Sequence, residues 1–135
     1  MKIFSAEEIR LWDQYTMRHE PITSIDLMER AATSCVDWLE INGYSENQFV
    51  VFCGKGNNGG DGLAIARLLA AKKYPIRIFI LEFGHKGTND FQINLARLHE
   101  HPEVDIRFVQ SEKNFHEFNT REIIIDALYG SGLNR

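Results

Sequence analysis

The sequence predicts an α/β protein with a Rossmann-like fold, a three-layer α/β/α sandwich on a mostly parallel sheet, with a helical elaboration at its N-terminus. From position 48 onward, short apolar runs alternate with segments of helical periodicity, which is the pattern of a parallel sheet covered on both faces. The runs are rich in β-branched and aromatic residues, as in "FVVFC" and "IRIFIL", which favours buried strands. A length of 135 residues fits one domain.

The first expected element is an amphipathic helix. Ser5 and Glu8 have the spacing of a capping box, in which each side chain accepts a hydrogen bond from the other residue's backbone N–H. Ile9, Trp12 and Tyr15 follow at three-residue steps and form an apolar stripe. We expect this helix to pack on the sheet.

A second amphipathic helix is predicted from Ser24 to a stop at Gly43. Its apolar stripe has alternating spacings of three and four residues and consists of Ile25, Met28, Ala32, Cys35 and Leu39. We interpret this stripe, together with Trp38, as core packing. Cys35 and Cys53 lie at apolar positions without a C-x-x-C motif or clustered histidines, so both are predicted to be small buried residues rather than metal ligands.

The alternating part of the chain begins with the strand "FVVFC", which a glycine-rich loop joins to the next helix. The remaining elements are a helix over 60–72, the strand "IRIFIL", a helix carrying Phe91, Leu95 and Leu98, the strand "VDIRFV", a short amphipathic piece around Phe115 and Phe118, and a strand from Glu122 to Asp126. Right-handed crossovers then favour the strand order 3-2-1-4. In that order the loops "GKGNNGGDG" and "DALYGSGLNR" meet at the carboxyl ends of adjacent strands, where open α/β sheets bind ligands.

The first loop suits a phosphate or pyrophosphate group. Its glycines permit close approach of a ligand, and the following helix directs unpaired N–H groups at the cleft. It lacks the Gly-Lys-Ser/Thr ending of a Walker A loop, so phosphoryl transfer from ATP is disfavoured. Asn57 and Asn58 either form the turn or bind a hydroxyl, phosphate or cation, and Asp61 either caps the helix or contacts the ligand.

Asp126 ends an apolar strand at the edge that the two loops share. Its carboxylate is expected to project into the cleft with Asn58, where it can coordinate a cation or exchange a proton. The alternative is a turn residue that accepts hydrogen bonds from the backbone N–H groups that follow. The five histidines are scattered in polar settings, and none is assigned a role.

Composition excludes several other classes of protein. The formal net charge of -4 offers no basic surface for nucleic acid or an anionic membrane. The N-terminus becomes charged too early for a signal peptide, and no apolar run is long enough to span a membrane. We therefore expect a cytoplasmic protein with neither nucleic-acid nor membrane partners.

The segments "GNNGGDG" and "DALYGSGLNR" closely resemble the two signature loops of the NAD(P)H-hydrate epimerase family, the YjeF N-terminal domain. The segments "SAEEIRLWDQYTM" and "IDLMERAA" resemble that family's N-terminal helices. The resemblance covers residues 1–135 as a single domain of this type. Because the family domain continues to a further strand and a "D-x-P-S-G"-like turn, the domain is expected to be incomplete at its C-terminus.

The resemblance implies an isomerase that interconverts the R and S epimers of hydrated NADH and NADPH at C6, upstream of a fused or separate ATP- or ADP-dependent dehydratase. It also implies a homodimer, and a potassium ion bound by Asn58 and Asp126. The implied substrate contacts are Asn57, Asn58, Gly59, Gly60 and Asp61 in the first loop, and Gly130, Ser131, Gly132, Leu133, Asn134 and Arg135 in the second.

Our hypothesis for catalysis begins with the hydrated carbon. C6 is a carbinolamine carbon, so the ring nitrogen can help to expel its hydroxyl group, and the planar iminium that results accepts water from either face. We assign Asp126 as the proton shuttle, acting first as acid and then as base.

Two alternative functions are weighed. A dehydrogenase would use the glycine fingerprint and place Glu82, about 20 residues further on, against the ribose hydroxyls. A catalytically silent interaction module is the other, since the same fold occurs as a dimerisation domain in an mRNA-decapping scaffold.

Overall fold

The structure is a computed structural model that describes residues 3–82, 84, 86–115 and 118–130. Within them the chain forms α1 (Ala6–His19), α2 (Ser24–Ile41), β1 (Gln48–Cys53), α3 (Asn57–Ala71), β2 (Ile76–Leu81), α4 (Asn89–Leu98), β3 (Asp105–Val109), the 3-10 helix η1 (Glu112–Asn114) and β4 (Glu122–Ala127). The predicted α/β class and the order of the elements are confirmed.

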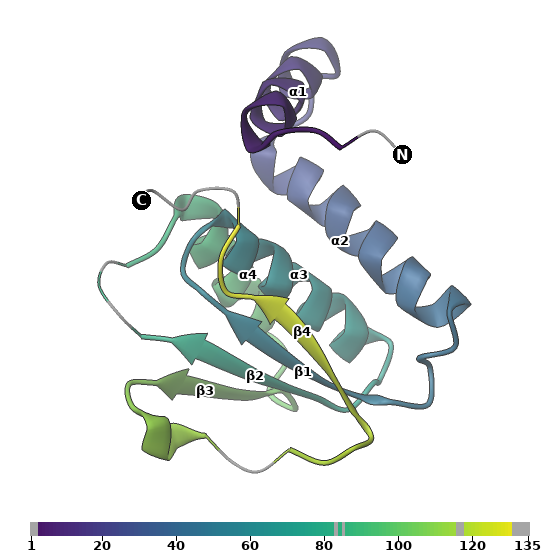
Figure 1. Ribbon diagram of the computed structural model, residues 1–135, viewed down its shortest axis with the longest axis vertical. Helices are drawn as coiled ribbons and strands as arrows, with labels where there is room; N and C mark the ends of the chain where they lie inside the picture. Colours follow the sequence, from purple (N-terminus) through teal and green to yellow (C-terminus); the bar gives the residue numbers. More distant parts are fainter. Residues whose placement is uncertain (1–2, 83, 85, 116–117, 131–135) are drawn as a thin grey trace.

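The four strands form one parallel sheet in the order β3-β2-β1-β4 (Figure 1). This is the order that the crossover rules predict. In the register between β1 and β4, Phe52 pairs with Asp126 and Cys53 with Ala127. The carboxyl ends of these two strands are therefore adjacent, and the loops that follow them begin side by side.

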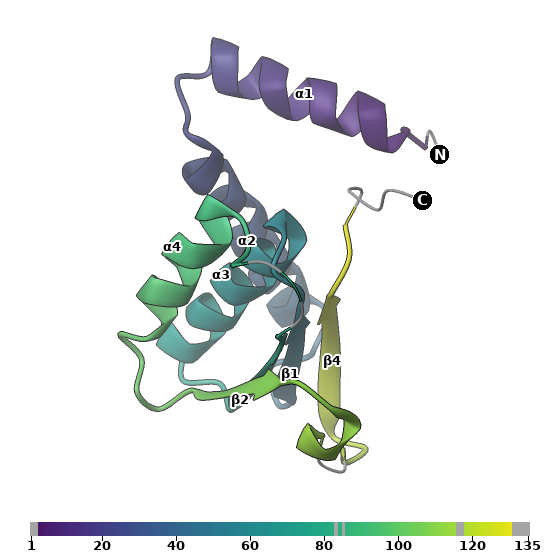
Figure 2. The ribbon, with the colours of Figure 1, turned by 90° about the vertical axis from the view of Figure 1, so that its left-hand side faces the viewer.

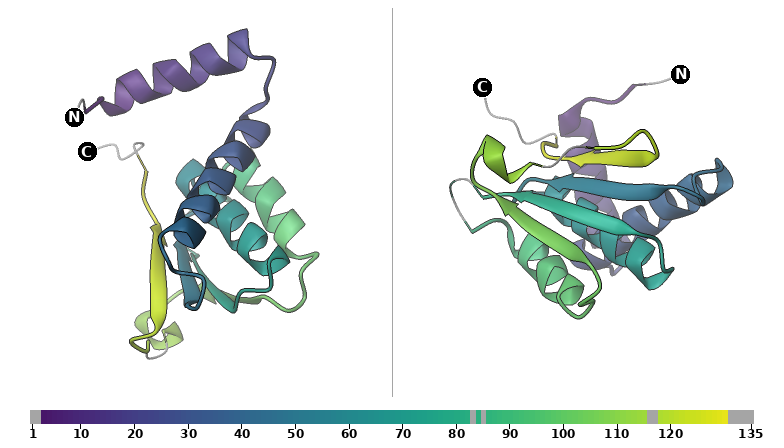
Figure 3. Two further views of the ribbon diagram at one scale, coloured as in Figure 1. Left: turned by 90° about the vertical axis from the view of Figure 1, so that its right-hand side faces the viewer. Right: turned by 90° about the horizontal axis from the view of Figure 1, so that it is seen from below.

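The two faces of the sheet are covered unequally. Figures 2 and 3 show α2, α3 and α4 on one face and the short η1 on the other. On the helical face, Val51, Leu63 and Ile78 belong to a buried cluster between the sheet, α3 and α4. On the opposite face, the rings of Phe115 and Phe118 pack against those of Phe52 and Phe79. The amphipathic segment expected around Phe115 and Phe118 thus covers this face of the sheet, but its only helical part among the described residues is the three-residue η1.

Helix α2 packs against α3 and belongs to the buried core, as predicted, but the residues that it buries differ in part from the predicted stripe. Met28 and Ala32 are buried, but the next buried position is Val36 rather than Cys35. Cys35 is exposed, whereas Cys53 is buried, so the prediction that the cysteines are buried is wrong for the first and confirmed for the second. Trp38 is 56% exposed, which corrects its assignment to the core.

Helix α1 departs from the expectation that it packs on the sheet. Its predicted capping box is present, with the Glu8 N–H donating to Ser5 Oγ and the Ser5 N–H donating to Glu8 Oε2. However, none of its residues is buried, and Trp12 and Tyr15 remain more than half exposed. Figure 2 shows α1 beyond the carboxyl ends of the strands, above the loop that follows β4. No helix among the described residues is long and apolar enough to cross a membrane.

Candidate functional site

The glycine-rich loop leads directly into α3, which begins earlier than predicted. The helix starts at Asn57, and its N-cap is Gly56, which has no side chain to cap it. The first helical hydrogen bond is donated by the Gly60 N–H to the Gly56 carbonyl. The N–H groups of the first turn therefore have no acceptor within the helix and point out at its N-terminus, as an anion-binding site requires.

This early start corrects one interpretation of Asp61. The residue lies in the second turn of α3, too far along the helix to cap it. Gly59 and Gly60, which follow the two asparagines, belong to the first turns of the helix and are both buried, so they are not loop residues. The Cα of Gly60 packs against the Met28 side chain of α2. Because glycine has no side chain, any contact of Gly60 with a substrate must come from its backbone.

Close backbone contacts join the two signature loops. A Cβ atom on Gly59 would lie 1.9 Å from the Gly54 carbonyl oxygen, and one on Gly54 would lie 2.2 Å from the Leu128 carbonyl oxygen. The Gly54 N–H also donates to the Ala127 carbonyl, at 3.0 Å. Only glycine permits such a stack of backbones.

The second loop reaches the start of α3 at Asn58. A Cβ atom on Gly130 would lie 3.0 Å from the Asn58 Cβ. Of the predicted site residues, the structure thus brings together Asn58 and Gly130, while Asn57 lies exposed at the first position of the helix. The meeting of the two loops, predicted from the strand order, is confirmed. The predicted contacts Ser131, Gly132, Leu133, Asn134 and Arg135 lie outside the described residues.

Asp126 lies near the end of β4, on the face away from α3. Ile125 and Ala127 pack with the helical face, so by strand alternation Ile124 and Asp126 point to the other face, and both are exposed. Asp126 Oδ1 accepts a hydrogen bond from the Leu128 N–H at 3.0 Å. This bond shapes the start of the second loop and leaves the other carboxylate oxygen for a ligand. The catalytic role of Asp126 stays a prediction.

Asp61 has an unusual electrostatic environment. Its pKa is raised from the ordinary value of 3.8 to about 6, mainly by burial and to a smaller extent by the carboxylates of Asp13 on α1 and Asp90 on α4. Sequence reasoning missed this group of carboxylates because its members belong to three helices that are far apart in the chain.

Asp61→Asn is expected to stabilise the fold at neutral pH. Because the native carboxyl holds its proton more tightly than the unfolded one, the native state binds more protons between pH 3.8 and about 6, and stability falls as the pH rises through that window. The substitution removes this loss. After a discount for partial exposure, we expect a gain of about 1–2 kcal/mol at pH 7 and none below pH 3.8, measured by urea unfolding at both pH values. Equal pH dependence in both proteins would contradict the assignment.

A salt bridge that sequence reasoning also missed holds the first loop in place. Lys55 follows β1 and pairs with Glu82 at the end of β2, and the Lys55 side chain is only 9% exposed. The Lys55 carbonyl also accepts a hydrogen bond from the Thr88 N–H at 2.9 Å. Opposite charges at the ends of adjacent strands were a signal that could have revealed the pair. Because Lys55 occupies the Glu82 carboxylate, the pair counts against the dehydrogenase alternative, which needs that carboxylate for a ribose.

Glu82→Gln should destabilise the protein, because it removes the ion pair that Glu82 makes with the Lys55 ammonium, whose side chain is only 9% exposed. We expect a loss of about 1–2 kcal/mol, less than for a fully buried pair because Glu82 itself is partly exposed. Urea unfolding measures the loss. Glu20→Gln, which breaks the exposed pair with Arg30, is the control and should cost less than about 1 kcal/mol. Equal losses in the two variants would show that the pair with Lys55 contributes no more than a surface ion pair.

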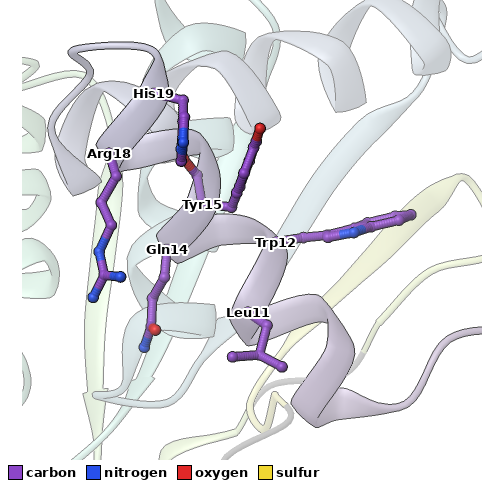
Figure 4. Close-up of a pocket in the computed structure, with 6 residues that line it drawn as sticks. All are labelled: Leu11, Trp12, Gln14, Tyr15, Arg18 and His19. Atoms are coloured by element: carbon purple, nitrogen blue, oxygen red, sulfur yellow. The ribbon is translucent and has the colours of Figure 1, made fainter.

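A shallow hollow of about 450 Å³ lies elsewhere, along α1 (Figure 4). Its lining residues among the described part of the chain all come from this one helix: Leu11, Trp12, Gln14, Tyr15, Arg18 and His19. The rings of Tyr15 and His19 stack with centroids 3.7 Å apart. The described residues of the two signature loops do not line this hollow, so it is distinct from the place where Gly130 meets Asn58.

A parallel sheet with two glycine-rich loops in contact at the carboxyl ends of adjacent strands defines a ligand-binding domain of the Rossmann-like class. Residues 24–135 match the family model described as YjeF-related protein N-terminus. The chain therefore belongs to the YjeF N-terminal domain family.

Named relatives and a solved structure agree with this membership. The chain is 34% identical over 132 residues to the NAD(P)H-hydrate epimerase of Oenococcus oeni, covering 97% of this chain and 60% of the relative. It is 36% identical over 143 residues to the protein of that name from Anaerococcus prevotii, covering 100% of this chain and 62% of the relative. The crystal structure of yeast ynu0 matches the whole chain and 59% of its own, with a TM-score of 0.75 at 23% identity, and shows the same fold. The chain thus spans about three fifths of the length of these proteins.

Proposed function

We propose that the protein is an isomerase that interconverts the R and S epimers of hydrated NADH and NADPH at C6. The observation that carries the proposal is the contact between the two signature loops, where Gly130 lies against Asn58 at the N-terminus of α3. The name that the relatives bear, NAD(P)H-hydrate epimerase, supports the same activity. A dinucleotide has the pyrophosphate that a helix N-terminus and glycine-rich backbone can hold.

The first-loop residues Asn57 to Asp61 and the second-loop residues from Gly130 to Arg135 are proposed to bind this substrate. The backbone N–H groups at the start of α3 would hold phosphate oxygens, and the side chain of Asn58 would orient the reacting end. Asp126, at the edge of the same site, would exchange protons with the C6 hydroxyl group and with the incoming water.

The potassium ion implied by the family fits the residues present. Asn58 offers a carboxamide oxygen and Asp126 a carboxylate oxygen, the hard oxygen donors that such cations prefer. Among the described residues, no group of three or more His, Cys, Asp and Glu side chains is placed to hold a metal ion, so a transition-metal site has no support there. When bound, the cation would supply positive charge that balances the carboxylate and orients it.

The proposal is tested by incubating the purified chain with the R epimer of hydrated NADH or NADPH in potassium buffer. Chromatographic resolution of both epimers over time should show faster approach to equilibrium than without protein. Exchange of potassium for a bulky organic cation should slow the reaction. No acceleration over the spontaneous rate would contradict the proposed activity.

The proposed setting is a cytoplasmic repair pathway in which a fused or separate dehydratase, dependent on ADP or ATP, consumes the S epimer. A homodimer is proposed for the functional unit. The second candidate function, a catalytically silent interaction module, is favoured by the aromatic side chains of α1, of which Trp12 and Tyr15 are more than half exposed. Inactivity in the epimer assay, combined with self-association in sedimentation experiments, would favour the interaction module.

A further inference from the structure

The Asp61 carboxyl group lies at the same corner of the molecule as the proposed substrate site. Asp61 follows Asn58 by three residues on α3, a spacing that places the two side chains on neighbouring faces of the helix. Asn58 lies beside Gly130 of the second loop, and Gly62 packs against Ala127 of β4. One turn after Asp61, Ile65 packs with the buried face of α2. Asp61 is therefore directed to the side of α3 where α2 and the loop after β4 lie.

Two carboxylates on other helices add to the effect of burial on the Asp61 carboxyl group. Asp13 of α1 and Asp90 of α4 both raise the pKa of Asp61. Cys35 of α2 is largely exposed, and the pKa of its thiol is raised first by its partial burial and then by the charge of Asp61. Helix α1, to which Asp13 belongs, lies beyond the carboxyl ends of the strands (Figure 2). Half-burial and two like charges disfavour the ionised form of Asp61. The environment thus keeps a proton available on this side chain at a pH where an ordinary aspartate has lost it.

We propose that Asp61 is the proton donor that releases the C6 hydroxyl group of the hydrate as water. This inference rests on the proposed epimerase function and divides the acid and base roles between two carboxyl groups. An acid works best when it is still partly protonated at the operating pH. Two carboxyl groups in different environments are the usual way in which one site supplies both an acid and a base.

The proposed reaction exchanges one hydroxyl group at C6 for another through an iminium intermediate. The Asp61 carboxyl proton passes to the C6 hydroxyl oxygen, the C–O bond breaks, and the lone pair of the ring nitrogen forms the iminium bond while water leaves. A second water attacks C6 from the opposite face, and its proton goes to Asp126. Nothing is oxidised or reduced, and exchange with solvent restores both carboxyl groups. The reverse reaction runs through the same states, so both directions share one pH profile.

A purely structural role for Asp61 is disfavoured by its cost. A half-buried carboxyl group among like charges destabilises the fold at neutral pH, and an asparagine of the same shape would avoid that cost. The structure thus holds an ionisable group where a neutral one would be more stable, as is typical of residues that exchange protons.

The test compares the pH dependence of kcat/KM for epimerisation in the wild-type chain, Asp61→Asn, Asp61→Glu and Asp13→Asn, with the exposed Asp37→Asn as control. In the wild type, kcat/KM should fall tenfold per pH unit above about pH 6. Asp61→Asn should lower kcat/KM by about 100-fold, and its kcat/KM should no longer fall above about pH 6. Asp61→Glu should retain the fall of kcat/KM with rising pH. In Asp13→Asn this fall should begin at a lower pH, because one of the negative charges near Asp61 is gone. The control should match the wild type.

A wild-type chain that fails to interconvert the epimers overturns the proposed function and this inference with it. An active wild type whose pH profile is unchanged by Asp61→Asn overturns only the role of Asp61. Carboxyl-carbon NMR titration of the wild-type protein provides a readout that does not depend on activity or on the folding of the variants. Titration of Asp61 near its ordinary value of 3.8 would overturn the inference, and titration near 6 would support it.

Discussion

Gly59→Ala is expected to destabilise the protein by about 3 kcal/mol or more and to abolish substrate binding. The new Cβ atom would lie 1.9 Å from the Gly54 carbonyl oxygen and 2.7 Å from its carbon. Gly54 cannot retreat, because its own Cα faces the Leu128 carbonyl at a distance that leaves no room for a Cβ. The clash therefore spreads from α3 through the first loop to the second. The gain in helix propensity from alanine, about 1 kcal/mol at most, is too small to offset it.

Gly56→Ala is the matched control. It changes the same residue type in the same loop, but apart from its chain neighbours no atom of the described residues lies within 4 Å of the added Cβ, and the φ angle of -86° suits alanine. We expect a change within about 1 kcal/mol, the cost of a poorer N-cap residue. Chemical denaturation of both variants measures the difference. Similar stabilities for the two would show that the contact between Gly59 and the Gly54 carbonyl is not rigid.

Asp126→Asn is expected to reduce epimerisation by about 100- to 1000-fold with little effect on the fold. The asparagine Oδ1 can still accept the hydrogen bond that the Leu128 N–H donates to Asp126, so the start of the second loop should keep its shape. The carboxamide cannot take a proton from the attacking water and binds a cation less strongly. Steady-state rates with the R epimer measure the loss.

Asp37→Asn serves again as control, because Asp37 is an exposed aspartate on α2. Its rate and thermal unfolding should match the wild type. Undiminished epimerisation by Asp126→Asn would exclude Asp126 as the proton shuttle and would leave its hydrogen bond to the Leu128 N–H as its only supported role.

The candidate site was predictable from sequence in outline and not in its electrostatics. Asn58 and Asp126 stand in recognisable motifs, and the strand order alone implied that their loops meet. By contrast, nothing local relates Asp61 to Asp13 and Asp90, because the three carboxylates come close only when α1, α3 and α4 assemble. The pair of Lys55 with Glu82 likewise depends on the packing of two loops that follow different strands.

The sequence by itself determined the elements whose signals lie within a few residues. The capping box of Ser5 and Glu8 opens α1, and β2 occupies the apolar run Ile76–Leu81, because caps and strand runs depend on neighbouring residues. Only the tertiary structure decided which side chains of each helix are covered. It buried Val36 in place of Cys35, left Trp12 exposed, and extended α3 back to Asn57. The physical reason is that burial and pKa depend on surfaces supplied by distant segments, and those surfaces exist only after the helices and the sheet have packed.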